Sequence, residues 1–342
     1  MSLDPVPWFI GGEAEHSAES ARALAWIATN GRTGISRPGD LVVRPLNVPG
    51  GGVLVAPGGG SIESTYAGAS QQSYTVSNTK SAQVPVPANT GSSAVTRYVG
   101  IEINDPQYAG AFPADRANGP YTRFVVRSSL SRGVHPWLPL ARLRIPASTS
   151  AITGSMITDI RELANPRRVE RVHARPRISA DGGSQQNLTA RTSAGGEFFP
   201  GGGGSPNTFQ VDVPEWAVMM IVEADWMSIR YQGGETGWGR YWMEYGTEYR
   251  PNTWPNKQQF EFATQHFAWD SAESHTNVTN WRLMDTRSVP AKLRGKTVTF
   301  AYKAGYDPKS KSTKTVSMSA LGGLGCRVTF IEAPEGDWQA AN

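Results

Sequence analysis

The chain reads Leu-Pro-Leu-Ala-Arg-Leu-Arg-Ile-Pro-Ala from Leu138 to Ala147, and its leucine and isoleucine residues alternate with alanine and arginine. This alternation predicts a strand that buries one face. Pro146 is expected to end the strand, because proline has no N–H to donate to a sheet ladder. A second apolar run, from Met156 to Leu163, leads to the turn signal Asn165-Pro166. The whole stretch contains no plausible catalytic set.

The rest of the first half carries the same short-strand pattern. Its candidate strands follow one another at spacings typical of sandwiches and barrels. They are Leu41–Val43, Val53–Val55, Tyr74–Val76, Val84–Val86, Tyr98–Ile103 and Phe124–Val126. Pro85 and Pro87 place their segment at a sheet edge. With 37 glycines and 24 prolines in 342 residues, the composition favours turns and short strands over long helices.

One helix is predicted, over residues 17–29. Ser17 is a suitable N-cap, Glu19 favours the first turn electrostatically, and the alanine-rich centre has high helix propensity. Asn30-Gly31 supplies a left-handed stop. We expect the helix to pack on a sheet through one apolar face. That face consists of Leu24, Ile27 and Ala28.

The second half also predicts β structure, with candidate strands that can form two packed sheets. They are Trp216–Ile229, Gly239–Tyr245, Gln259–Phe267, Thr297–Tyr302, Thr313–Met318 and Arg327–Ile331. The fold class expected for the whole chain is therefore mainly β. It comprises an N-terminal β-rich domain with one short helix, followed by a C-terminal antiparallel β-sandwich.

The length of 342 residues suggests about two domains. We expect an N-terminal domain over 1–165, an Arg/Gly-rich linker over 166–206 and a C-terminal sandwich over 207–342. The linker begins with an arginine-dense run at 166–177 and ends with glycines. Two interpretations of the arginine run stay open, namely docking against acidic neighbours or nucleic acid, and an extended solvated arm.

Aromatic residues are dense between Trp226 and Trp254, interleaved with arginine and glutamate. Rings flanked by polar groups suit stacking on sugars. The candidate ligand-binding residues, as a glycan platform, are Trp238, Tyr241, Trp242 and Trp254. Strand alternation would place Tyr241, Met243 and Tyr245 on one face, with Trp242 and Glu244 on the other. The alternative is that these rings fill the sandwich core and subunit contacts, because aromatic residues dominate core and interface energetics.

Catalytic motifs are absent from the sequence. It has no Gly-x-Ser-x-Gly elbow, no His-Glu-x-x-His pair, no phosphate loop and no cysteine pair. We therefore expect no enzyme activity and no cofactor. The single cysteine, Cys326, excludes an internal disulfide and is expected to be a small buried core residue.

Two clusters of acidic and imidazole side chains are candidate metal sites. The first is Glu13, Glu15 and His16, and the second is His266, Asp270, Glu273 and His275. The first lacks a second histidine nearby and is interpreted as an approach to the helix N-cap. The second has no recognised ligand spacing and is interpreted as loop polarity. We expect no metal site, and we interpret the glycine-rich segment 57–60 as a turn, since no helix start follows it.

Five segments of the first half are informative together: Asp4–Phe9, Glu15–Glu19, Pro49–Gly60, Tyr66–Val76 and the join Leu138–Ala164. In this order they resemble segments of minor tail proteins of siphophages that infect actinobacteria. In that family a strand, a short Thr-Ser loop and a Met-Ile-x-Asp-x-Arg segment close the N-terminal domain. Asp105–Tyr108 fits the position of an acidic Asp-Pro loop after a strand. The resemblance covers about residues 1–165 and does not extend beyond about residue 170.

This resemblance implies a virion structural protein of the tail tip or baseplate. The N-terminal half would anchor to the tail, and the C-terminal sandwich would project. The alternative is a host-surface carbohydrate-binding module for receptor recognition. An enzyme that degrades the cell envelope ranks third.

The implied partners are other phage tail proteins and further copies of the chain, with a trimer favoured, and host cell-envelope polysaccharide under the alternative. No nucleic-acid partner is expected, because a net charge of +4 falls well short of dense basic stripes. Membrane insertion is not expected either, since the apolar run at 216–222 is too short to span a bilayer. The N-terminus lacks the features of a signal peptide. We therefore expect synthesis in the host cytoplasm and residence in the virion.

Overall fold

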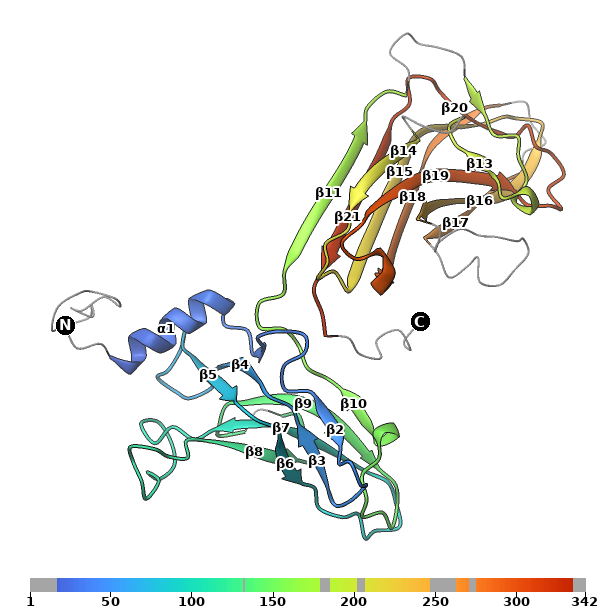
Figure 1. The fold of residues 1–342 in the computed structure, drawn as a ribbon. Coiled ribbons are helices and arrows are strands. Elements are labelled where there is room, and N and C mark those ends of the chain that lie inside the picture. Colours follow the sequence, from blue (N-terminus) through green and yellow to red (C-terminus); the bar gives the residue numbers. More distant parts are fainter. Residues whose placement is uncertain are drawn as a thin grey trace. The chain divides into compact units, whose positions relative to one another are not determined.

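The structure is a computed structural model that describes residues 17–131, 133–178, 185–201, 207–246, 263–270 and 275–334. The chain is mainly β, with a single α-helix among these residues (Figure 1). It divides into two compact units, and the boundary between them falls after Pro166. The first unit comprises Met1–Pro166 and Ala333–Asn342, and the second spans Arg167–Glu332.

Helix α1 (Ala18–Thr29) has the predicted ends. Ser17 Oγ accepts a hydrogen bond from the backbone N–H of Ser20 at 3.1 Å, and Asn30 ends the helix with a left-handed φ of 50°. The predicted packing face is wrong, because Leu24 and Ala28 are exposed and Ile27 is 70% exposed. The helix packs on β5 (Ser73–Asn78) instead, with the partly buried Arg22 in a polar network beneath it.

Three antiparallel sheets form the first unit. One contains β1 (Gly34–Ile35), β4 (Gly58–Glu63) and β5. A second contains β2 (Val43–Pro45), β3 (Gly52–Val55) and β6 (Ala82–Pro85). The third has the order β10 (Ile157–Asp159), β9 (Trp137–Ile145), β7 (Val95–Ile103) and β8 (Thr122–Arg127). A 3₁₀ turn, η1 (Gly154–Met156), precedes β10.

Strand β9 confirms the alternation predicted for the join. Leu143 and Ile145 are fully buried, and the intervening Arg142 and Arg144 are exposed. The buried side chains of β9 belong to one apolar core with those of β3, β4 and β7. The first unit therefore has a core of its own.

The segment 57–60 is not the predicted turn, because Gly58 begins strand β4. Its glycines allow an approach that a side chain would prevent. A Cβ atom at Gly60 would lie 2.7 Å from the carbonyl oxygen of Gly34 and 2.9 Å from Leu138 Cδ2. Glycine is thus needed where β1, β4 and β9 meet.

The second unit is an antiparallel β-sandwich, as predicted. One sheet has the order β11 (Arg168–Arg175), β21 (Leu324–Ile331), β15 (Met219–Tyr231), β20 (Val316–Met318) and β12 (Gln186–Asn187), with β18 (Asn277–Ser288) paired to β15. The other has the order β13 (Glu197–Phe198), β19 (Thr297–Tyr306), β16 (Thr236–Tyr245) and β17 (Thr264–Asp270), with β14 (Thr208–Asp212) paired to β19. Two 3₁₀ turns, η2 (Thr192–Ala194) and η4 (Ala291–Leu293), lie between strands.

The segment 166–206 differs from the predicted linker. Its arginine-dense start forms β11, which pairs with β21 along its whole length. Leu188 and Phe199 are fully buried in the sandwich core. The arginines misled the prediction because they fall mostly on exposed positions of an edge strand, while Val169 and His173 of that strand pack inward.

Aromatic rings from both sheets fill the sandwich core. Trp226 of β15 lies with its ring centroid 5.2 Å from those of Tyr241 and Tyr302, which belong to the opposite sheet. Trp281 of β18 stacks on Tyr241 at 4.5 Å. Cys326 is buried in the same core, as predicted, and burial raises the pKa of its thiol.

Candidate functional site

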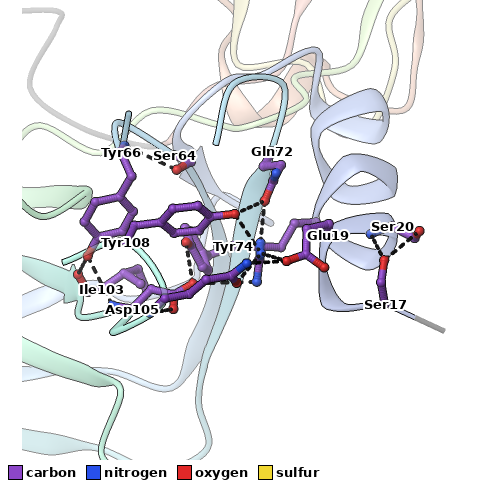
Figure 2. A network of polar contacts seen from close by, with 12 residues as sticks. Ser17, Glu19, Ser20, Ser64, Tyr66, Gln72, Tyr74, Ile103, Asp105 and Tyr108 are labelled. Carbon is purple, nitrogen blue, oxygen red and sulfur yellow. Dashed lines mark hydrogen bonds and ion pairs between the residues drawn. The ribbon is translucent and has the colours of Figure 1, made fainter. Parts of the chain in front are cut away.

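A network of polar contacts lies beneath α1 in the first unit (Figure 2). Arg22 projects from the helix, and only 12% of its side chain is exposed. Its Nε atom donates to Gln72 Oε1 at 2.6 Å, and its Nη2 atom donates to Gln107 Oε1 at 3.0 Å and to the Tyr108 hydroxyl at 3.2 Å. The guanidinium is therefore enclosed by acceptors from two loops.

Carboxylates balance the charge of Arg22. Asp105 Oδ2 lies 3.6 Å from Arg22 Nη1, and Glu19 Oε1 lies 3.3 Å from Arg22 Nη2. Gln107 joins them, because its Nε2 atom donates to Glu19 while its oxygen accepts from Arg22. The side-chain hydrogen bond from Gln107 lowers the pKa of Glu19, and the charge of Arg22 acts in the same direction.

Asp105 follows β7 and is held on both oxygens. The hydroxyl of Tyr74, on β5, donates to Oδ2 at 2.8 Å, and the backbone N–H of Gln107 donates to Oδ1 at 3.0 Å. Burial raises the pKa of Tyr74, and the hydrogen bond to Asp105 and its negative charge raise it further. Tyr74 is thus held as a neutral donor.

Tyr66 lies at the centre of the network and is buried. Its ring stacks on Tyr108 at 5.5 Å, and its hydroxyl donates to the Ile103 carbonyl at 2.9 Å. The same oxygen accepts from the backbone N–H of Asp105 at 3.1 Å and lies 2.8 Å from His135 Nδ1. Because the only hydroxyl proton is committed to Ile103, His135 Nδ1 must carry the proton of that last contact.

A second ionic cluster lies on β7 and β8. Glu102 is buried and accepts hydrogen bonds from Arg123, at 2.6 Å and 2.9 Å, and from Arg127. The Arg127 guanidinium also lies 4.4 Å from the ring centroid of Trp137. Burial opposes ionisation of Glu102, but the hydrogen bonds from Arg127 and Arg123 outweigh it and lower its pKa. Glu102 therefore stays ionised and fixes both arginines.

An open groove of about 560 Å³ borders the Arg22 network. We call it the α1 groove and define it by Arg22, Tyr74, Asp105, Gln107, Phe112 and Tyr121, which line it with their neighbours. Its volume falls within the range of small-ligand sites, about 300 to 1,000 Å³. The walls combine aromatic rings with a carboxylate, a guanidinium and amides, which can donate and accept hydrogen bonds.

The structure buries two of the four residues predicted to form a glycan platform. Tyr241 is 6% exposed and points into the core, and Trp242 is 3% exposed on the opposite face of β16. A Cβ atom at Gly196 would lie 2.4 Å from the Trp242 ring, so glycine backbone covers that ring. Neither ring has a free face for a sugar. Trp238 is half-buried, and Trp254 lies outside the described residues.

Only part of the two candidate metal clusters lies among the described residues. Glu13, Glu15, His16 and Glu273 lie outside the described residues. His266 and Asp270 lie on β17, where Asp270 accepts a hydrogen bond from Thr236. Burial lowers the pKa of His266, and the nearby positive charge of Arg240 lowers it further. Across the described part of the chain, no group of three or more His, Cys, Asp or Glu could hold a metal ion.

Sequence reasoning identified only part of the Arg22 network. The segment Asp105–Tyr108 was singled out as an acidic loop, but Arg22, Tyr66 and Tyr74 were not singled out as its partners. The available signal was an arginine in the middle of an alanine-rich helix.

Among the described residues, no helix has the length and hydropathy that a membrane span requires.

Comparisons with known proteins leave the family open. No protein-family model matches the chain. No curated protein sequence matches it either.

Solved structures show weak similarity. The VP2 subviral particle protein of infectious bursal disease virus is 10% identical, with a TM-score of 0.21 over 92% of this chain and 82% of that chain. PNGase F, a glycosylasparaginase from Flavobacterium meningosepticum, is 8% identical, with a TM-score of 0.24 over 72% and 87%. The tandem CBM22 domains of Xyn10C from Paenibacillus barcinonensis are 12% identical, with a TM-score of 0.19 over 88% and 100%. Similarity at this level does not assign a function.

Proposed function

We propose that this chain is a virion structural protein of a phage tail tip or baseplate. In this proposal the first unit anchors the chain to other tail proteins, and the second unit projects from it. One observation carries the proposal. The described segments that resemble minor tail proteins of actinobacterial siphophages contribute buried side chains to the core of the first unit.

The correspondence can be followed strand by strand. Segment 49–60 supplies β3 and the start of β4, and segment 66–76 supplies most of β5. Segment 138–164 supplies most of β9 and all of β10. These strands pair β4 with β5 and β9 with β10, and their side chains share one apolar core. A resemblance spread over core strands concerns the fold of the unit and not an isolated motif.

The second unit supports a projecting role through its separate core. Its two sheets enclose an aromatic core of their own, so it does not depend on apolar residues of the first unit. The role requires no catalysis by this chain. We further propose that several copies assemble symmetrically around the tail axis, with a trimer favoured, because the tail-tip proteins that this chain resembles commonly act as symmetric multimers.

The proposal is tested by deleting the gene from the phage genome and supplying the tagged full-length chain in trans. We expect particles without the chain to lack a complete tail tip. Complemented particles should bind an anti-tag antibody at the tail tip in negative-stain images. Normal, infectious particles without the chain would contradict the proposal, as would label confined to the head.

A further inference from the structure

We propose that the α1 groove of the first unit binds a neutral sugar ring of a polysaccharide. This inference goes beyond the structural role proposed above, and it places a glycan site away from the aromatic cluster of the second unit. Three features of the groove carry it, namely an exposed aromatic ring, fixed planar hydrogen-bonding groups and a balanced charge.

Phe112 supplies the aromatic surface. It lines the groove and is 54% exposed. The guanidinium of Arg116 lies 4.5 Å from its ring centroid. The face of an aromatic ring carries partial negative charge, and the C–H groups of a sugar ring carry partial positive charge. A sugar that stacks on Phe112 would remove apolar surface from water as well.

Planar polar groups line the same groove in fixed positions. The Oδ2 atom of Asp105 is engaged by Tyr74 and Arg22, and its Oδ1 atom accepts from the backbone of Gln107 and keeps a lone pair for a further donor. The Gln107 side chain lines the groove beside it. Sugar hydroxyl groups are donors that match the free position on Asp105 Oδ1.

Arg22 and Asp105, the two charged residues that line the groove, have opposite charges, which favours a neutral ligand. The positive charge of Arg22 is offset by Asp105 and Glu19, which lie within 3.6 Å of it. Its guanidinium already donates to Gln72, Gln107 and Tyr108, and little of the side chain is exposed. Arg22 is therefore not open to a phosphate or carboxylate group, and an anionic polymer would meet the carboxylate of Asp105.

The test uses the full-length chain and three soluble neutral polysaccharides, a galactan, an arabinan and a dextran, in affinity gel electrophoresis. We expect at least one polymer to retard the protein. Phe112→Ala should weaken that retardation at least tenfold by removing the stacking surface. Thr75→Trp is a second variant, because Thr75 is exposed at the groove and a bulky ring there would block it. Val134→Ala is the matched control, an exposed apolar residue of the same unit that does not line the groove.

Absence of retardation by all three polymers would overturn the inference. Retardation that both groove variants leave unchanged would overturn it too, because the polymer would then bind elsewhere. The same variants are scored for incorporation into particles. Variants that lose incorporation, in a protein that binds no polymer, would identify the groove as a docking surface for a tail protein. That result would overturn the sugar site and leave the structural role intact.

Discussion

Arg22 ties helix α1 to the loop after β7 through polar contacts. The helix presents no buried residue, and its most apolar face is exposed, so apolar packing does not explain why it stays in place. The guanidinium supplies the missing attachment by donating to Gln72, Gln107 and Tyr108 and by pairing with Asp105. The polar contacts of Arg22 therefore hold this helix in place, a role that buried leucine side chains have in most helices.

We predict that Arg22→Ala destabilises the first unit by about 1 to 3 kcal/mol, because it leaves half-buried acceptors without donors. The measurement is urea unfolding of the full-length chain followed by circular dichroism. Arg44→Ala serves as the control, since Arg44 is an exposed arginine of β2 and should change stability by less than about 0.5 kcal/mol. Equal effects of the two substitutions would refute the role assigned to Arg22.

Glu102 makes the first unit sensitive to acid. Hydrogen bonds from Arg127 and Arg123 overcome its burial and hold its pKa below the ordinary value of 4.5. A carboxyl with a lowered folded-state pKa adds stability that is present above pH 4.5 and is lost as the pH falls through the folded-state pKa. Protonation would leave the charges of both arginines without a counterion.

We therefore predict that Glu102→Gln lowers the urea midpoint at neutral pH and makes the acid-induced decrease shallower than in the unaltered chain. The midpoint is measured in a series from neutral pH to below 4.5. Glu162→Gln, which alters an exposed carboxyl of the same unit, is the control. If Glu102→Gln gives the same pH profile as the unaltered chain, Glu102 does not stabilise the fold.

Among the elements, the glycine-rich strand β4 is closely packed against its neighbours. It lies between β1 and β5, and Gly60 approaches both the backbone of Gly34 and the side chain of Leu138. We predict that Gly60→Ala lowers the free energy of unfolding of the first unit by about 1 to 3 kcal/mol, the usual effect of overpacking. Gly154→Ala is the control, because a Cβ atom there meets nothing within 4 Å. A neutral effect of Gly60→Ala in chemical denaturation would show that β4 can move aside.

Strands with regular alternation could be predicted from the sequence, and others could not. Strand β9 shows why alternation works, since its arginines are exposed and its leucines are buried. Strand β4 begins with three glycines and so has no side-chain pattern to detect. Strand β11 is rich in arginine because it lies at a sheet edge, and β18 is mostly exposed along its first half. These strands are defined by their neighbours and not by local preference.

The polar network could also be predicted only in part from the sequence. The loop Asp105–Tyr108 could be recognised, because Asp-Pro after a strand is a local signal. Its partners Arg22, Tyr66 and Tyr74 come from a helix, a loop and another strand, and only the folded unit brings them together. For the aromatic residues of β16, alternation assigned the two faces correctly, but it could not show that Gly196 covers the outer ring of Trp242.

At the scale of the whole molecule, the two units have separate apolar cores and should unfold separately. We predict two transitions in calorimetry. Tyr241→Ala should lower the free energy of unfolding of the second unit by about 3 to 5 kcal/mol, as expected for removing a core ring, and so lower only that unit's transition temperature. Gly60→Ala should lower only the transition temperature of the first unit. A single transition that both substitutions shift would show that the units are thermodynamically coupled.

The central claim is that the chain is a structural part of the tail tip in several copies. The most direct test is a cryo-EM reconstruction of purified particles of the phage that encodes it, with this chain traced. The account predicts density for both units at the tail tip, in symmetry-related copies that contact other tail proteins through the first unit. Absence of the chain from the purified particles would contradict the claim, and a single copy would contradict the proposed assembly.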